Sequence, residues 1–134
     1  MQYFKHGGTY GQMYWSPATG AHEVHGMILP EYLEGMGGPA AYGMPITNEL
    51  TTPDGVGRFN HFEGGRSIYW TSGTGAHAVY GAIRTAWAQT GWELGALGYP
   101  TTDEHDVVGG GGRQSDFQHG YINWVNGVTT VHLS

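Results

Sequence analysis

A chain of 134 residues, 39% of them hydrophobic, is long enough to bury one core but too short for two independent domains. Its 5 basic and 11 acidic residues give a formal charge of −6, so it lacks the basic surface that neutralises a nucleic-acid backbone or an anionic membrane. The absence of cysteine excludes disulfides, thiolate metal ligands and thiol nucleophiles.

The chain combines 25 glycines with 5 Trp, 9 Tyr and 4 Phe. Aromatic side chains carry large burial energies, so the glycines indicate turns between packed elements rather than disorder. No apolar run approaches the roughly 20 residues that span a bilayer, and the first six residues lack the apolar middle of a secretory signal. We therefore expect no membrane insertion. If the chain is exported, a leader has been removed or another segment supplies one.

The first predicted elements are a short strand at residues 13–16 and a short helix after it. Val24, Ile28 and Tyr32 recur every four residues, which predicts one apolar face of that helix. Pro30 is compatible with a helix that begins near Gly26, because a proline in the first turn needs no N–H partner. We expect a helix of about two turns.

The next predicted elements repeat this order with clearer signals. Aromatic and β-branched residues flank a glycine turn in residues 62–71, which is typical of a β-hairpin. Val79, Ile83 and Trp87 then predict an amphipathic helix over residues 77–89. Residues 97–104 follow as a proline-containing turn, and residues 42–49 are the matching turn of the first unit.

The two segments align with an offset of 55 residues, from residues 14–28 on 69–83 to Gly65 on Gly120, and about a third of the paired positions are identical. After Gly120 the register slips by one, and the chain ends at Ser134 before another helix can begin. We place the boundaries in two turn-like segments, which gives repeat 1 (1–58), repeat 2 (59–113) and a partial repeat 3 (114–134) with opening strands only.

The predicted fold is a mixed α/β, strand-rich tandem repeat with a short β-hairpin and a short helix in each unit. Such a unit cannot bury its apolar face alone, and about three or more units are normally needed for a stable stack. A linear stack and a ring closed like a small propeller both stay open. The short array favours a homo-oligomer in which several chains complete one body.

The repeated segments resemble the LGFP-repeat family, which is named for a Leu-Gly-Phe-Pro tetrapeptide. The resemblance covers nearly the whole chain and is strongest in the second unit, whose matching segments are Leu97-Gly98-Tyr99-Pro100, Gly75-Ala76-His77 and Phe62 before Ile68-Tyr69-Trp70. The first unit departs from the tetrapeptide, with Tyr42 and Met44 in place of Leu and Phe. The resemblance implies an extracellular or cell-wall-associated module, because such repeats occur in secreted bacterial proteins as anchoring or wall-polysaccharide-binding segments.

Each unit carries a tryptophan directly after a tyrosine or an asparagine. Adjacent side chains of a strand face opposite ways, so one of each pair is expected to pack inward and the other to face out. The tryptophans serve either core packing or stacking on sugar rings, whose C–H surface suits a flat aromatic face. The candidate stacking residues are Tyr14, Trp15, Tyr69, Trp70 and Trp124.

Polar residues also recur at equivalent positions. His22 and His77 lie between a Thr-Gly turn and the predicted helix, where they serve either a structural role near the helix start or ligand contact. No second ligand recurs at metal-binding spacing around them, so we expect no metal site. Glu49 and Glu104 recur beside the proline turn, where they either bond the local backbone or accept hydrogen bonds from sugar hydroxyls.

Catalytic signatures are weak. Ser67, Ser72 and Ser115 stand in no Gly-x-Ser-x-Gly context, and residues repeated in each unit suit multivalent binding better than a single active site. We expect no enzyme and no cofactor. The favoured function is a non-catalytic, multivalent, lectin-like module that binds a cell-wall or surface polysaccharide. The alternatives are a structural or protein-interaction scaffold and, third, a glycan hydrolase that uses paired carboxylates such as Asp103 and Glu104.

Overall fold

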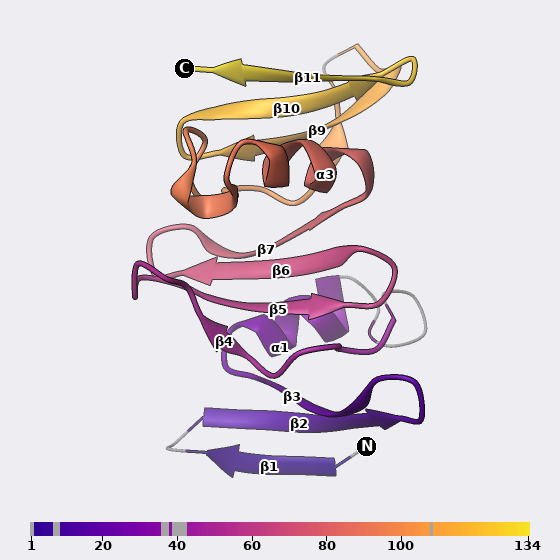
Figure 1. Ribbon diagram of the computed structural model, residues 1–134, viewed down its shortest axis with the longest axis vertical. Helices are drawn as coiled ribbons and strands as arrows, with labels where there is room; N and C mark the ends of the chain where they lie inside the picture. Colours follow the sequence, from indigo (N-terminus) through magenta and orange to yellow (C-terminus); the bar gives the residue numbers. More distant parts are fainter. Residues whose placement is uncertain (1, 7–8, 36–37, 39–42, 108) are drawn as a thin grey trace.

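The computed structural model describes residues 2–6, 9–35, 38, 43–107 and 109–134; Tyr42, which departs from the family tetrapeptide, lies outside them. The described strands form three separate antiparallel sheets that follow one another along the long axis of the molecule (Figure 1). The first sheet has the order β1-β2-β3 and contains β1 (Gln2–His6), β2 (Thr9–Ser16) and β3 (Gly20–His25).

The second and third sheets each add a two-residue edge strand to a three-stranded meander. The second sheet consists of β4 (Leu50–Thr51), β5 (Arg58–Phe62), β6 (Arg66–Thr71) and β7 (Gly75–Tyr80) in this order. The third sheet consists of β8 (His105–Asp106), β9 (Gly112–Phe117), β10 (Gly120–Val125) and β11 (Val128–Leu133), with the same order of neighbours. The hairpin predicted at residues 62–71 is confirmed as the β5–β6 pair.

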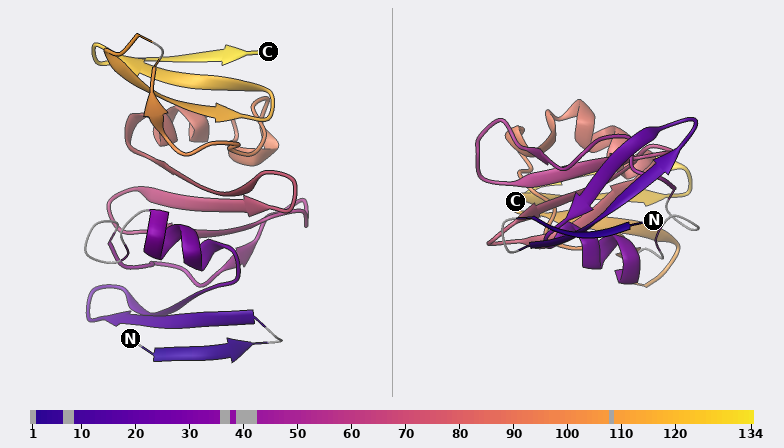
Figure 2. Two further views of the ribbon diagram at one scale, coloured as in Figure 1. Left: turned by 180° about the vertical axis from the view of Figure 1, so that it is seen from behind. Right: turned by 90° about the horizontal axis from the view of Figure 1, so that it is seen from below.

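Helical segments lie between successive sheets (Figures 1 and 2). The first is α1 (Ile28–Pro30), which continues as the π-helix η1 (Glu31–Gly35), and the second is α3 (Gly81–Gln89), followed by the 3-10 helix η2 (Trp92–Leu94). Pro30 lies within the first turn, as predicted. The molecule is therefore a layered stack of sheet, helix, sheet, helix and sheet.

Each helix contributes one large aromatic residue that joins the sheets above and below it. Tyr32 stacks on Phe62 of the second sheet at 4.6 Å and meets Tyr14 of the first sheet edge-on at 5.3 Å. Trp87, 55 residues later, contacts Tyr69 of the second sheet at 4.8 Å and Phe117 of the third at 5.4 Å. The repeat in sequence is thus also a repeat in packing.

The predicted helix over residues 77–89 is wrong at its start, because residues 77–80 belong to β7 and the helix begins at Gly81. Tyr80 is extended, with φ −154° and ψ 172°, and Gly81 has φ 63°, a left-handed conformation in which glycine carries no steric penalty. The chain therefore turns sharply at Gly81. Val79 still faces the same core as Ile83 and Trp87, but from the strand.

Closure of the stack into a ring is not seen. The two termini lie at opposite ends of the long axis, and the described strands form open sheets (Figure 1). The third unit consists of strands, without a helix in its described part. Within the described part of the chain, no helix is long and apolar enough to cross a membrane.

Candidate functional site

An aromatic cleft of about 310 Å³ opens beside the second sheet, on the side that faces α3. Strands β5 and β6 supply Phe59, His61 and Tyr69 to one wall. The segment after α3 supplies the other wall. Its complete lining is Pro53, Phe59, His61, Tyr69, Gly91, Trp92, Glu93 and Leu94, and we refer to it below as the aromatic cleft.

The strand wall is built from stacked rings. Phe59 and Tyr69 are cross-strand partners, and their rings lie 4.9 Å apart at an interplanar angle of 7°. Alternation along β5 places His61 on the same face as Phe59, with its ring 5.0 Å away. The indole of Trp92 lies 6.4 Å from the Tyr69 ring at 24°, so it continues this aromatic surface from a different element.

Two successive residues with left-handed backbone place Trp92 in the cleft. Gly91 has φ 104° and Trp92 has φ 58°, so the chain reverses after α3 and brings the indole back toward the sheet. Positive φ is uncommon for a bulky side chain and costs of order 1–3 kcal/mol. Such strain is concentrated at functional sites. One face of the indole is also covered, because the Arg84 guanidinium lies 5.0 Å from its centroid.

His61 is held neutral in the cleft wall. Burial, and then the nearby charge of Arg84, lower its pKa to about 4. Arg84 Nε donates to Ser67 Oγ at 2.8 Å, and Ser67 Oγ lies 2.6 Å from His61 Nδ1. An arginine can only donate, so the Ser67 hydroxyl donates onward to Nδ1 and leaves the proton of the imidazole on Nε2. His61 is therefore a neutral hydrogen-bond donor.

Glu93 is the one carboxylate among the residues that line the cleft. It is 9% exposed, and burial raises its pKa against the opposing effect of its own backbone N–H, with Asp54 adding to the rise. A carboxyl group at this position can accept hydrogen bonds, and can also donate one when it is protonated. The cleft thus combines aromatic faces with a few polar groups, which is the usual composition of a small-molecule site.

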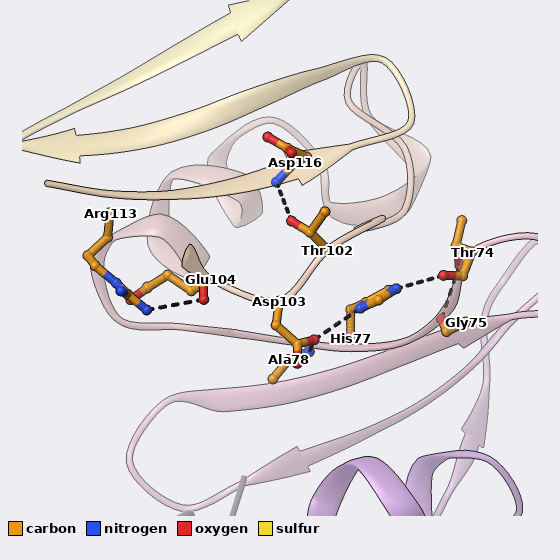
Figure 3. Close-up of polar contacts among 9 residues, drawn as sticks. All are labelled: Thr74, Gly75, His77, Ala78, Thr102, Asp103, Glu104, Arg113 and Asp116. Carbon is orange, nitrogen blue, oxygen red and sulfur yellow. Dashed lines mark hydrogen bonds and ion pairs between the residues drawn. The ribbon is translucent and has the colours of Figure 1, made fainter. Parts of the chain in front are cut away.

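The histidines predicted as candidates lie elsewhere, in two equivalent clamps that we call the histidine clamps. His77 Nε2 lies 2.6 Å from the Thr74 carbonyl and Nδ1 lies 3.0 Å from Asp103 Oδ1, as Figure 3 shows. The same carboxylate oxygen accepts from the Ala78 N–H at 3.2 Å. The clamp therefore fastens the loop that precedes β8 to strand β7 and its turn.

The first histidine clamp has the same geometry with an amide in place of the carboxylate. His22 contacts the Thr19 carbonyl at 2.7 Å and Asn48 Oδ1 at 3.2 Å, and Asn48 Oδ1 accepts from the Glu23 N–H. These contacts support the structural interpretation of His22 and His77. Both residues lie within strands β3 and β7, however, and not near a helix start as expected.

The second clamp also meets the preceding unit through Glu31. Burial, together with a hydrogen bond to Asp103 and its charge, raises the pKa of Glu31 to about 8. Burial also acts to raise the pKa of Asp103, but hydrogen bonds with His77, Glu31 and the Ala78 amide lower it. Burial opposes the charged form of His77, yet the bonds to Asp103 and Thr74 raise its pKa. A protonated Glu31, an ionised Asp103 and a charged His77 thus meet where the first helical segment faces β7.

The histidine clamps allow a direct test, because the chain contains both the carboxylate and the amide form. We expect Asp103→Asn to lower the pKa of His77, measured by NMR titration of the imidazole, since the charged acceptor is lost. The raised pKa means that His77 stabilises the fold fully below its ordinary value of 6.5 and that this contribution fades as the pH rises through the folded value. The variant should therefore lose melting temperature at acidic pH and little at alkaline pH. Asn48→Asp is the matched control in the first clamp, and an unchanged His77 titration in Asp103→Asn would contradict this account.

The paired aromatic residues divide between core and surface. Tyr14 and Tyr69 are 2% and 3% exposed, whereas Trp15 and Trp124 are 66% and 38% exposed. Trp70 is half-buried against the first core cluster. The prediction that neighbours face opposite ways is confirmed, with tyrosine inward and tryptophan outward. Of all the predicted ligand-binding residues, only Tyr69 lines the aromatic cleft.

The repeated glutamates lie next to arginines of the adjoining strands. Glu104 Oε2 accepts from Arg113 Nε at 2.9 Å, and the same guanidinium reaches Asp106 at 2.7 Å (Figure 3 shows the Glu104 pair). Burial raises the pKa of Glu49 to about 7, and the charge of Arg58 opposes the rise. Both carboxylates thus have partners within the chain, which fits the local bonding interpretation.

Sequence reasoning missed Phe59, His61, Trp92 and Glu93, because it searched for residues that recur. At the offset of 55, the counterpart of Trp92 is Gly37, and that of Glu93 is Gly38. The available signal was a lone tryptophan between Gly91 and Gly95, immediately after an amphipathic helix. The cleft is therefore an individual feature of the second unit.

The layered packing and the cleft define a class of protein, namely a tandem-repeat module that carries a small-molecule site on one unit. A family model described as LGFP repeat matches residues 1–40, 43–95 and 97–133. The chain belongs to the LGFP-repeat family. A search of curated proteins gives no match. In the second unit, the tetrapeptide 97–100 holds the layers together, because the Gly98 carbonyl accepts from Trp87 Nε1 and the Tyr99 hydroxyl donates to Thr52 or Asp54.

Proposed function

We propose that this protein is a non-catalytic, lectin-like module that binds a carbohydrate in the aromatic cleft. The observation that carries the proposal is the juxtaposition of stacked aromatic rings with a neutral imidazole and a buried carboxyl group. The C–H face of a sugar ring packs on an aromatic plane, while its hydroxyl groups need donors and acceptors at the edge. Trp92 and Tyr69 supply the plane, and His61 and Glu93 supply the polar edge.

The size and charge of the cleft favour a neutral sugar. A volume of about 310 Å³ is at the lower end of the range for small-molecule sites, which suits one sugar residue of a longer polymer. The cleft lining contains no lysine or arginine, and His61 is neutral, so nothing in the lining would attract an anionic sugar. The ligand class we propose is a cell-wall or surface polysaccharide, bound outside the cell.

Useful affinity for a polymer would come from several clefts acting together, since each later contact is effectively intramolecular. One aromatic cleft in this chain means that further clefts must come from other chains or other units. We therefore keep a homo-oligomer as part of the proposal. Light scattering is the direct measurement, and a mass near 14.5 kDa at every concentration would remove the oligomer.

Replacing Trp92 with alanine tests the proposal. We expect the variant to lose binding to any polysaccharide found with a glycan array, by about tenfold or more, because aromatic stacking contributes roughly 1–3 kcal/mol per ring. Leu94→Ala is the matched control, since this side chain also lines the cleft but is 59% exposed and offers no flat face. Calorimetry would measure both affinities.

Circular dichroism of the same variants separates loss of binding from loss of folding. A Trp92→Ala protein that keeps its melting temperature and its affinity would place the site elsewhere. A blank across arabinose- and galactose-containing wall polysaccharides would instead favour the second candidate, a structural or protein-interaction scaffold. The specific observation behind that candidate is Trp15, which is 66% exposed on a sheet face outside the aromatic cleft.

A glycan hydrolase is the third candidate, and the cleft gives it less support than binding. Both hydrolytic mechanisms use a pair of carboxylates that flank the scissile bond. Glu93 has a raised pKa suited to a general acid, but no second aspartate or glutamate lines the cleft. Asp103 and Glu104, suggested by the sequence, are bonded to His77 and Arg113 instead.

A further inference from the structure

The outward face of the first sheet is exposed, whereas the same face of the other two sheets is covered. Met13 is 37% exposed on this face, while its counterparts Ile68 and Ile122 are both 0% exposed. Trp15, next along the same face, is 66% exposed, and Trp124 at the equivalent position of the third sheet is 38% exposed. The first sheet thus leaves in solvent the positions that the other sheets bury.

The covering element is in both cases the helix of the preceding unit. Ile28 and Tyr32 of the first helical segment share one core cluster with Ile68. Residues Ile83 and Trp87 of α3 share the other cluster with Ile122. Each helix therefore presents a branched residue and, four residues later, an aromatic one to the sheet that follows it. Among the described residues, no helix precedes the first sheet.

We propose that the face of the first sheet around Met13 and Trp15 is an acceptor surface for the amphipathic helix of a further LGFP-type unit. The argument is continuity with an interface that this chain forms twice, with the same positions on both partners. A second folded copy of the chain does not supply such a helix, because both described helices are already packed between two sheets (Figure 1). The proposal is independent of sugar binding, because none of these residues lines the aromatic cleft.

The surface also indicates how its occupant differs from the helices within the chain. Glu23 pairs with Met13 across β2 and β3, at the position where the second sheet has the buried Ala78. A helix on the first sheet must therefore place a polar or basic side chain near this carboxylate. In α3, Arg84 directly follows the core residue Ile83, so a basic residue in this part of the helix is compatible with the unit.

Thiol labelling can test the acceptor surface, because the natural chain has no cysteine. The first protein is the 134-residue chain with Met13→Cys. The second carries the same substitution and a duplicate of residues 58–112 inserted directly ahead of residue 3, which keeps the 55-residue spacing and places a copy of α3 before the first sheet. We expect labelling at position 13 to slow by about tenfold or more in the extended chain, because the thiol becomes accessible only through local opening.

Matched controls define the result. Ser72→Cys, in the exposed β6–β7 turn, should label at the same rate in both chains, and Ile83→Asp in the duplicated copy of α3 should restore fast labelling at position 13. Equal rates at position 13 in both folded chains would overturn the proposal. Protection in the 134-residue chain that rises with protein concentration would also overturn it, because a second copy would then be the occupant.

A second measurement covers an extended chain that does not fold. A peptide of residues 81–97, added in large excess to the Met13→Cys chain, should slow labelling at position 13 and leave the Ser72→Cys rate unchanged. Absence of any slowing under these conditions would count against the proposal in the same way. An oligomer that forms through another part of the surface would leave the thiol at position 13 reactive.

Discussion

Replacing Trp87 with alanine is expected to lower the free energy of unfolding by about 3–5 kcal/mol, the usual cost of truncating a fully buried tryptophan. The side chain is 0% exposed and contacts Tyr69 of one sheet and Phe117 of the next. Its Nε1 also donates to the Gly98 carbonyl at 3.1 Å, so the variant leaves a buried acceptor unpaired. One substitution thus weakens the junction of two units.

Urea denaturation followed by circular dichroism measures this loss. Trp15→Ala is the matched control, because the same chemical change at a 66% exposed position should alter stability by less than about 0.5 kcal/mol. A small domain has a total stability of only about 5–15 kcal/mol, so Trp87→Ala is expected to be at least partly unfolded at 37 °C. Equal midpoints for the two variants would contradict the central role of Trp87.

Replacing Gly95 with alanine is expected to displace the segment that carries Trp92. A Cβ atom at Gly95 would lie 1.9 Å from the Thr90 carbonyl oxygen, which is backbone and has little freedom to move. The turn from Thr90 to Gly95 must then open, and the indole moves away from Tyr69. We expect a loss of roughly 1–3 kcal/mol in stability, as for overpacking, together with loss of polysaccharide binding.

Gly73→Ala supplies the control for this prediction. Gly73 lies in the β6–β7 turn, and a Cβ atom there meets nothing within 4 Å. The substitution should therefore leave both the melting temperature and the intrinsic fluorescence close to wild type. Fluorescence of the Gly95→Ala protein reports on the tryptophan environment directly, and an unchanged spectrum with unchanged stability would show that the turn tolerates the added methyl group.

The repeat and its spacing could be predicted from the sequence because they depend on local chemistry. Glycine turns and alternating aromatic residues define a hairpin, and the four-residue spacing of Ile83 and Trp87 defines one helix face. The start of the helix was misplaced because Val79 continues this spacing from a strand. Only the backbone at Gly81, with φ 63°, distinguishes the two elements.

The aromatic cleft could not be predicted by the same reasoning, since its residues do not recur. Phe59, His61 and Tyr69 share a face of two strands, but Trp92 reaches them only through two left-handed residues after α3. The histidine positions were correctly singled out by their recurrence. Their partners, Asn48 and Asp103, lie 26 residues further along the chain, and only the folded loop brings them together.

The direction of the strands has a mechanical consequence. The strands run across the long axis of the stack, and the first and last strands lie at opposite ends of it (Figure 1). Hydrogen bonds between antiparallel strands are perpendicular to the strands, so tension applied through the termini acts along these bonds. Such a load separates β1 or β11 from its neighbour one bonded pair at a time, as a zip opens. An array of these units under tension would lengthen in small steps at low force, like an elastic tether.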